Sequence, residues 1–529
     1  MINYYPDFFN DVFGPIMQPG SSSHTAAPCR LGLLARALLG ENPIAAEFIM
    51  DKDGSFAGTF GVMDEDKGML AGILGIWPED ERISSVYELA RKNGICYRFI
   101  FDSMKESDHL NAIKIVLKGE SGKTAQLVGE STGGGMIRVR KVNGFDIHLI
   151  GDTYVMLIFA ELTHLEEKLL ANSLEGYIEA QILRCEDSTL YCIKTSCLPD
   201  SSKIKNAFPD IPIEILPPVL PVVMHKDRKP QLFKSMEEWR SRAIACGNSM
   251  SAAAMQYEVN SSLWSKEQVG TYMHKIKEVL YRQITAAYEE NSAPRNPFYR
   301  YDGEMWDEYQ HKNRILSGNL MGEVVKRAIG VISKTRGVPM VPGPMGTGGG
   351  YLFSAVYSVK EAYGFSDDDL IRGLFVAAGI GAIAYTHTNP TGEVVGCAGE
   401  CGVCCAMASA AIVEMAGGNG EDIENAASLA LQAFFGLPCD PVIGGYEAPC
   451  FSRAISAASM SVIFADLALA GSKAVIPYDE LLVALDNLGK SMSSELLCTS
   501  KGGACTTPTA KSCELKFREW FDNRNKILT

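Results

Sequence analysis

The spacing of apolar and polar residues divides the chain into stretches of different character. In residues 1–149, the run APCRLGLLARALLG (27–40) has helical spacing and closes on a glycine that suits a helix end. The polar segment GSSSHT (20–25) before it is suited to capping that helix. Strand-like alternation appears at 112–116 and at 136–142. This mixture predicts an α/β N-terminal domain.

Residues 150–218 alternate strand-like and helix-like runs in the order β-α-β-β-α-β. The predicted strands are TYVMLIFA, EGYIEAQILR, TLYCIKTSC and IPIEIL, and the predicted helices are LTHLEEKLLA and SSKIKNAF. This order is that of a small ferredoxin-like α+β module. The proline-bearing, mixed-charge run at 219–230 predicts a linker.

From residue 231 to residue 529 the spacing is helical almost throughout. The pattern predicts helices at 233–245 and 265–290, irregular structure at 291–316, and glycine-rich breaks at 342–351 and within the cysteine-rich stretch 391–453. The longest apolar run, Leu374 to Tyr385, is too short to cross a bilayer and predicts a buried helix. The fold class expected is therefore multidomain, with a mostly α-helical C-terminal domain.

Composition narrows the class of protein. The apolar share of 47% is that of a folded soluble protein, and the net charge of −14 argues against nucleic acid or an anionic membrane as partner. The first residues, MINYYPDFFNDVFG, lack the basic and apolar regions of a secretory signal. A cytoplasmic protein is expected, in which the 15 cysteines serve metal binding, redox chemistry or core packing rather than disulfides.

Three cysteines of the cysteine-rich stretch stand among glycine and proline, where thiolates can converge: Cys397, Cys439 and Cys450. Three thiolates would leave one iron of a [4Fe–4S] cluster open to bind a substrate oxygen as a Lewis acid. Three buried thiols without a metal are the alternative. Arg453, just beyond, can pair with a carboxylate of a substrate or of the protein itself.

The remaining cysteines of this stretch are Cys401, Cys404 and Cys405. With Cys397, the first two form C-x3-C-x2-C, a spacing that resembles the cluster motif of radical SAM enzymes. That motif follows an early strand, whereas this one opens the Ala- and Met-rich segment MASAAIVEMAGG late in the chain. Cys401 and Cys405 share one helix face at i, i+4, which favours small core residues.

Separated motifs carry a resemblance to a known family. The segments VGCAGECG (395–402) and GLPCDPVIGGYEAPC (436–450), with the tail at 468–509, look like the α part of iron–sulfur-dependent L-serine dehydratases. GSSSHTAAP, DHLNAIKIVL and GESTGGGMIRVRKVNGFDIHL look like the β part of that family. The order is β then α in one polypeptide, and the unit at 150–218 is similar to the ACT-like module of some β parts.

The resemblance implies a lyase that converts L-serine to pyruvate and ammonia with a [4Fe–4S] cluster. It places the cluster on the three cysteines set among glycine and proline, and makes Cys513 a candidate fourth ligand. His24 and His109 are the implied catalytic bases. The implied substrate-binding residues are Ser22, Ser23, Thr25 and Asn111. A homodimer that binds a small amino acid, and neither nucleic acid nor membrane, is expected.

Three loops depart from the family pattern: residues 61–66, 342–350 and 386–394. Because such loops would hold the substrate, other substrates for the same cluster stay open, namely L-threonine, L-cysteine through desulfidation, or a hydroxy acid. A non-catalytic amino-acid sensor that uses the ACT-like module is a further alternative.

Overall fold

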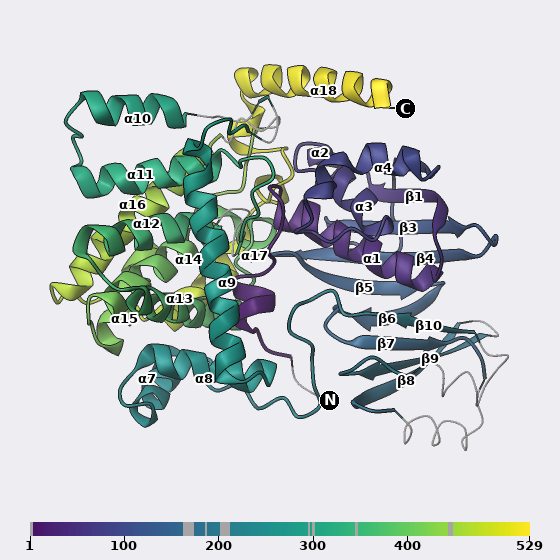
Figure 1. Ribbon diagram of the computed structural model, residues 1–529, viewed down its shortest axis with the longest axis horizontal. Coiled ribbons are helices and arrows are strands. Elements are labelled where there is room, and N and C mark those ends of the chain that lie inside the picture. The colour runs from purple at the N-terminus through teal and green to yellow at the C-terminus, as the bar shows by residue number, and fades with distance from the viewer. Residues whose placement is uncertain are drawn as a thin grey trace. The chain divides into compact units, whose positions relative to one another are not determined.

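The computed structural model divides into two compact units (Figure 1). The sheet unit contains Ser23–Arg228 with Tyr4, and the helical unit contains Tyr5–Ser22 and Lys229–Thr529. The described residues are 4–161, 174–185, 188–200, 212–294, 297–298, 302–343, 348–442 and 448–528, without the side chains of 524–528.

The sheet unit begins with a mixed six-stranded sheet of order β2-β1-β3-β4-β5-β6, in which β1 and β2 are parallel and the other neighbours antiparallel. Its strands are β1 (Pro43–Asp51), β2 (Cys96–Asp102), β3 (Ala112–Gly119), β4 (Thr124–Gly133), β5 (Met136–Val142) and β6 (Phe145–Leu149). Its helices are α1 (Ala27–Leu39), α2 (Ser55–Thr59), α3 (Glu65–Ile73) and α4 (Val86–Lys92). Helix α1 ends at Gly40 with φ 74°, as predicted.

Helices α1 and α3 approach each other through glycines. A Cβ at Gly72 would lie 2.2 Å from the carbonyl oxygen of Cys29 and 2.7 Å from the Cα of Gly32. No side chain fits in that space, so the two backbones are in direct contact. The predicted side-chain cap of α1 is absent, because Ser22–Ala26 form a π-helical turn that runs straight into the helix.

The second sheet of this unit is antiparallel with strand order β10-β7-β9-β8. Its strands, β7 (Tyr154–Ile158), β8 (Tyr177–Cys185), β9 (Ser188–Thr195) and β10 (Ile213–Leu216), stand at the four predicted places. Met156, Tyr191 and Ile193 pack on one face. Both predicted helices of the module lie outside the described residues, so the ACT-like assignment stays a prediction.

The helical unit is built around α14 (Gly392–Met415), which packs against α12, α13, α15, α16 and α17. Its other helices are α7 (Met236–Ala245), α8 (Met250–Ser262), α9 (Lys266–Thr285), α10 (Gly303–Lys312), α11 (Asn319–Ile332), α12 (Gly348–Tyr363), α13 (Asp367–His387), α15 (Gly420–Gln432), α16 (Cys450–Leu469), α17 (Tyr478–Ser491) and α18 (Pro508–Leu528). Figure 1 shows α14 in the middle of this helical layer.

Helix α10 lies where irregular structure was predicted, and that prediction is wrong for these residues. The Trp306 indole donates to the carbonyl of Gly322 at 3.3 Å, and Lys326 pairs with Asp307. Contacts with α11 therefore stabilise a helix whose own sequence is mostly polar and aromatic.

An N-terminal segment, Tyr5–Ser22, belongs to the helical unit. The Phe8 ring stacks on Tyr257 at 5.2 Å, and the Phe8 amide donates to Glu258 at 2.7 Å. The predicted domain 1–149 places this segment with the sheets. Its aromatic residues are buried among helices instead, because α8 supplies both a ring and a carboxylate.

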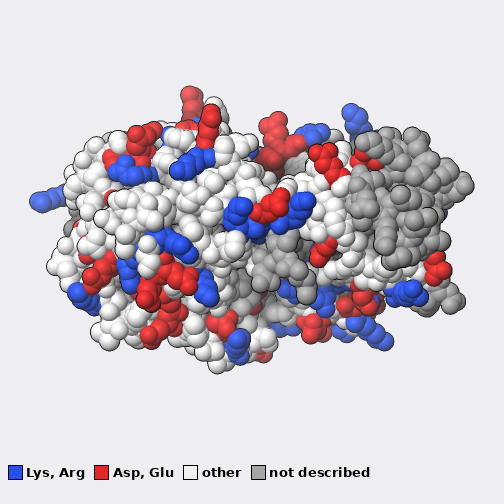
Figure 2. All heavy atoms as spheres, turned by 90° about the horizontal axis from the view of Figure 1, so that it is seen from below, with Lys and Arg blue, Asp and Glu red and all other residues white. Residues whose placement is uncertain are grey.

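Three helices are long and apolar enough to cross a membrane, judged by length and composition: α13, α14 and α16. Within their most apolar windows, 78% of α13, 94% of α14 and 44% of α16 is buried inside the protein. The predicted buried helix at 374–385 is confirmed as part of α13. Figure 2 shows Lys and Arg interspersed with Asp and Glu on the face it presents, rather than gathered into one basic area.

Candidate metal centre

The site starts at a kink in α14. Gly396 has φ 66° and ψ −167°, which only glycine adopts readily, and a Cβ there would lie 2.4 Å from the carbonyl oxygen of Leu437. That carbonyl accepts the amide of Ala398 at 3.2 Å. The predicted break in the cysteine stretch is therefore a kink inside a helix. It brings the segment that carries Cys439 alongside Cys397.

Cys397 is the centre of a buried group of thiols. Its sulfur accepts hydrogen bonds from the thiols of Cys401 and Cys439, and Arg453 Nη1 lies 3.6 Å away. The hydrogen bonds from Cys401 and Cys439, with the nearby guanidinium, hold the pKa of Cys397 well below its usual range. These contacts favour the thiolate form of Cys397, which is the form that binds metals and attacks electrophiles.

Glu400 adds a carboxyl to this group. Ligand atoms of Cys397, Glu400 and Cys439 all lie within 4.8 Å of one another. Burial raises the pKa of Glu400 well above its usual range, and the thiolate of Cys397 acts in the same direction. Both effects favour the protonated form of the Glu400 carboxyl, which also accepts the amide of Gly392 at 3.0 Å.

Two segments run side by side at Cys439, which forms an isolated parallel bridge with Leu497. The Cys439 amide donates to Leu496 and the Cys498 amide donates to Cys439, both at 2.8 Å. One residue further on, the Asp440 carboxylate accepts the amide of Ala504 at 2.7 Å. Gly503, with φ 70°, must lack a side chain because its Cβ would lie 2.3 Å from Asp440 Oδ2.

This parallel bridge brings Cys498, which the sequence interpretation missed, next to Cys439. Cys498 is 5% exposed, and its thiol is in hydrogen-bond contact with that of Cys439. The three cysteines predicted as cluster ligands stand among glycine and proline, whereas Cys498 has Leu497 and Thr499 beside it. Cys498 and Cys439 are far apart in the sequence, and their spacing matches no motif that would have predicted the contact.

Cys450 is the first residue of α16 and is half-buried. Arg453, one helical turn later, donates to Asp440 and to the carbonyl of Pro438, both at 2.7 Å. These contacts place the first turn of α16 beside the segment that carries Cys439. The structure thus joins Cys397 and Cys439 directly, whereas Cys450 lies one helical turn from Arg453, whose side chain reaches both of their segments.

The other helical cysteines differ from one another. Cys405 is buried, burial raises the pKa of its thiol, and Ser409 is its hydrogen-bond partner, as a core cysteine requires. Cys404 is also buried. Cys401, which the sequence interpretation grouped with them, instead donates to the sulfur of Cys397. Helical spacing alone could not separate these cases, since all three point into packed surroundings.

Buried hydroxyl groups flank the thiols. The side-chain oxygens of Tyr385, Thr391 and Ser500 are buried and have no hydrogen-bond partner within the described part of the chain. Thr391 is the N-cap of α14 yet makes no capping bond. A Cβ at Gly392, next to it, would lie 2.9 Å from the Cys439 sulfur. Thiols are soft ligands that suit a metal group bound through thiolates. Gly392 leaves space beside the Cys439 sulfur, and the buried hydroxyl groups can bind a polar ligand of that metal group.

In the sheet unit, His24 is fully buried. Its Nδ1 lies 2.8 Å from Ser23 Oγ, its Nε2 lies 2.9 Å from Ser55 Oγ, and its ring meets Phe56 edge-on at 5.3 Å. Both ring nitrogens are thus engaged by hydroxyl groups, which fix the ring orientation. Ser55, at the start of α2, was not singled out from the sequence.

The other predicted residues of this unit lie on neighbouring turns. Ser55 donates its amide to the carbonyl of Leu110 at 2.9 Å, so the His24 partner also contacts the turn that carries His109 and Asn111. His109 Nδ1 accepts the Asn111 amide at 3.1 Å, which leaves Nε2 to carry the proton of the neutral ring.

Thr25 and Ser22 lie on the π-helical turn that precedes α1, and both are buried. Thr25 donates its hydroxyl to the carbonyl of Met63, in the predicted divergent loop 61–66. In that loop Glu65 is fully buried and accepts from Thr59 at 2.6 Å and from Gly61 at 3.0 Å.

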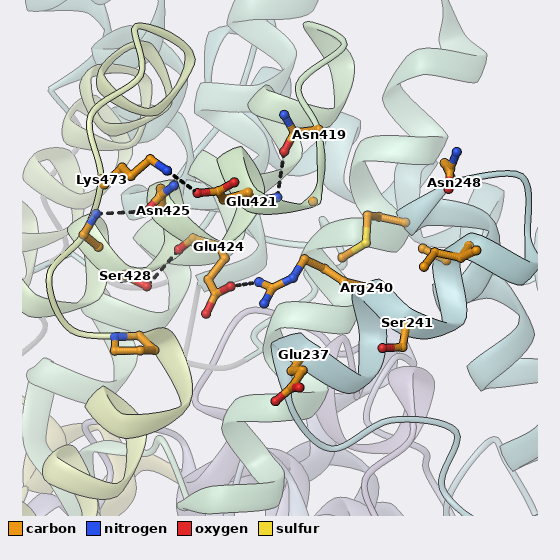
Figure 3. Close-up of a pocket in the computed structure, with 16 residues that line it drawn as sticks. Glu237, Arg240, Ser241, Asn248, Asn419, Glu421, Glu424, Asn425, Ser428 and Lys473 are labelled. Carbon is orange, nitrogen blue, oxygen red and sulfur yellow. Dashed lines mark hydrogen bonds and ion pairs between the residues drawn. The ribbon is translucent and has the colours of Figure 1, made fainter.

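A pocket of about 820 Å³ lies elsewhere in the helical unit, at α7 and the N-terminus of α15 (Figure 3). Lys473 pairs with Glu421 at 2.7 Å, and Arg240 pairs with Glu424. Asn425 accepts the amide of Ala474 at 2.9 Å. Both cations of the lining are thus paired with a carboxylate, and Glu237 is a third carboxylate on its wall.

The helical unit carries a buried group of cysteines and a glutamate that could hold a metal ion. The model of the family described as serine dehydratase alpha chain matches residues 223–504, more than half of the chain. The chain belongs to this family. It is an L-serine ammonia-lyase-like enzyme, a lyase.

Individual relatives match both parts of the chain. It is 35% identical over 209 residues to the probable L-serine dehydratase alpha chain of Bacillus subtilis, covering 39% of this chain and 70% of that protein. It is 28% identical over 269 residues to the L-serine dehydratase alpha chain of Peptoniphilus asaccharolyticus, covering 50% and 90%. The beta chain from the same organism is 36% identical over 148 residues, covering 28% and 66%.

Proposed function

We propose that this chain is an iron–sulfur-dependent lyase that eliminates water from L-serine to give pyruvate and ammonia. The observation that carries the proposal is the Cys397 thiolate, held by two further thiols and by Arg453 in one buried place. Membership of the serine dehydratase family supports the substrate. The similarity to separate alpha and beta chains supports an enzyme in which a beta-like part and an alpha-like part share one polypeptide.

Cys397, Cys439 and Cys450 would hold a [4Fe–4S] cluster. Bound there through three thiolates, the cluster would supply a Lewis-acidic iron toward the substrate hydroxyl. Arg453 stabilises the negative charge of Cys397 and is itself fixed by Asp440 at 2.7 Å. Gly392 keeps the space beside Cys439 clear. The protonated Glu400 can donate a proton to a leaving hydroxyl group.

The hydroxyls of Thr391 and Ser500 are the proposed donors to the substrate carboxylate, because they are buried and unsatisfied within the described residues. Tyr385 belongs to the same set. The predicted base is His24, with His109 as the second candidate, and Ser22, Ser23, Thr25 and Asn111 stay predicted substrate-binding residues. Removal of the α-proton and loss of water give aminoacrylate, which hydrolyses to pyruvate and ammonia.

The test is anaerobic reconstitution of the full chain with iron and sulfide, followed by pyruvate measurement with L-serine. Cys397→Ala should lose iron and activity together, whereas Cys405→Ala, on the same helix, should keep both. Strong pyruvate formation by cluster-free protein would contradict the mechanism. Parallel assays with L-threonine, L-cysteine and a hydroxy acid test the substrate, and faster turnover of any of these than of L-serine would replace it.

The proposal extends to a cytoplasmic homodimer. Scattered charge of both signs on the face of Figure 2 and the family of metabolic enzymes support this setting. Size-exclusion chromatography with light scattering measures the oligomeric state, and a mass equal to one chain would contradict the dimer.

A further inference from the structure

Strand β2 is an edge strand of the first sheet, and its outer side is open. It pairs with β1 on one side, and its other side has no backbone hydrogen-bond partner among the described residues. The opposite edge of this sheet differs, because β6 lies close to β8 of the second sheet. An uncovered row of backbone N–H and C=O groups is a template on which another strand can pair.

One face of β2 carries a row of aromatic side chains, Tyr97, Phe99 and Phe101. The rings of Tyr97 and Phe99 lie 5.7 Å apart between centroids, and Phe60 meets both Phe99 and Phe101 edge-on at 5.0 Å. Phe101 is nevertheless 43% exposed. An open edge that exposes apolar rings is a surface that a partner strand would cover.

The other face of β2 carries Arg98, Ile100 and Asp102, since side chains alternate along a strand. Arg98 pairs with Glu47 of β1, yet its side chain is still 68% exposed. Asp102 lies opposite Asp51 in register, and neither carboxylate has an ion-pair partner among the described residues. Like charges directly opposite one another destabilise a sheet, so a cation from outside would stabilise this end of the strand.

A second copy of β2 supplies that cation. If the two strands pair antiparallel about a two-fold axis at Ile100, Arg98 of each copy lies opposite Asp102 of the other. The same axis places Phe99 opposite Phe101 twice, so the aromatic rows also meet. The charges of this edge are therefore complementary to themselves.

From this complementarity we infer that two copies of this chain pair edge to edge through β2, antiparallel and centred on Ile100. The inference rests on the proposed homodimer and assigns its interface, and it does not depend on the metal chemistry. A second copy fits better than an unrelated strand, because the edge itself carries both members of each charge pair and of each aromatic pair.

The first test measures the dimer dissociation constant of the full chain by analytical ultracentrifugation. Asp102→Arg should raise the constant ~10- to 100-fold, because Arg98 would face an arginine in both pairs. Adding Arg98→Asp exchanges the two charges and should restore most of the affinity. Asp146→Arg, which changes an exposed aspartate on β6 of the same sheet, is the matched control and should leave the constant unchanged.

The second test is a covalent cross-link that needs no loss of affinity. Ile100→Cys, treated with oxidised glutathione, should give a disulfide-linked dimer, and peptide mass spectrometry should find position 100 joined to itself. Ile49→Cys is the control. Ile49 lies beside Ile100 in register but one strand further from the edge, out of reach of its counterpart in the other copy.

Two outcomes overturn the inference. A chain that stays monomeric overturns the interface together with the homodimer. A dimer that neither responds to Asp102→Arg nor cross-links at position 100 pairs through another surface, which overturns the interface alone. Failure of the proposed lyase is measured separately, as pyruvate formation by cluster-free protein, so the two failures are distinguishable.

Discussion

Arg453 donates a hydrogen bond of 2.7 Å to Asp440, and the same guanidinium nitrogen lies 3.6 Å from the sulfur of Cys397. The first contact fixes the side chain, and the second uses its charge. Asp440 also accepts the amide of Ala504 at 2.7 Å. One ion pair therefore ties together α14, α16 and the segment after α17.

Replacing Arg453 by Met should weaken the metal centre. The Cys397 thiolate would lose its nearby positive charge, and Asp440 would be left buried without its partner. We expect iron release to a chelator to be ~10- to 100-fold faster, as for other groups that support metal ligands. Arg372→Met, which removes an exposed pair with Asp369, is the control. Equal release rates for the two variants would contradict the role of Arg453.

Gly503→Ala should destabilise the helical unit more than its backbone conformation alone explains. Gly503 has φ 70°, and its Cβ would lie 2.3 Å from Asp440 Oδ2. Gly364 has φ 69° with no atom within 4 Å of its Cβ position, so Gly364→Ala isolates the backbone cost. That cost is about 1 kcal/mol, and Gly503→Ala should exceed it by ~1–3 kcal/mol. Denaturant unfolding of both variants measures the difference, and equal losses would mean that Asp440 moves freely aside.

Much of this architecture follows from local pattern. Periodicity and glycine position, which can be read directly from the sequence, predict several elements. These are the helix at 27–40, the strands at 112–116 and 136–142, and the four strands of the second sheet. Helix α10 and the segment Tyr5–Ser22 do not follow from local pattern, because contacts with residues far along the chain determine their structure.

The cysteines of the candidate metal centre also fall into two sets, those that the sequence could identify and those that it could not. Cys397 and Cys439 could be selected because Gly396 and Pro438 precede them and mark unusual backbone. Cys498 could not be selected from the sequence, because no glycine or proline beside it indicates its left-handed backbone conformation. The contact of Cys401 with Cys397 was also missed, because helical spacing gives the same answer for a core thiol and for a thiol that faces a centre.

Ser500→Ala should impair substrate binding without loss of stability. The Ser500 hydroxyl is buried and lacks a partner in the described residues, so its removal eliminates no internal hydrogen bond. If it donates to the substrate carboxylate, KM for L-serine should rise ~10-fold while the unfolding temperature holds. Ser461→Ala, which breaks a 2.7 Å bond to Ala458, is the control and should lower the unfolding temperature with KM unchanged. An unchanged KM in Ser500→Ala would remove Ser500 from the site.

The Ser55 hydroxyl should position His24. His24→Asn should lower kcat by ~10²- to 10⁴-fold if the imidazole is the base. Ser55→Ala removes the hydroxyl 2.9 Å from Nε2, and should lower kcat less and shift the acid limb of the kcat/KM pH profile. A purely structural serine would leave that limb in place. Thr195→Ala, which removes a hydroxyl that donates to the carbonyl of Cys197 at 2.7 Å in the second sheet of the same unit, is the control.

Glu65 should make the stability of the sheet unit depend on pH. Burial raises the pKa of its carboxyl well above the usual range. Above the ordinary glutamate pKa of about 4.3, the unfolded chain has lost this proton while the folded chain keeps it. The free energy of unfolding therefore falls as pH rises, by at most about 1.4 kcal/mol per pH unit, until the folded-state pKa is passed. Glu65→Gln cannot ionise, so its unfolding temperature should fall less over the same interval. Parallel pH curves for the two proteins, measured by thermal unfolding, would show that Glu65 is already ionised in the folded state.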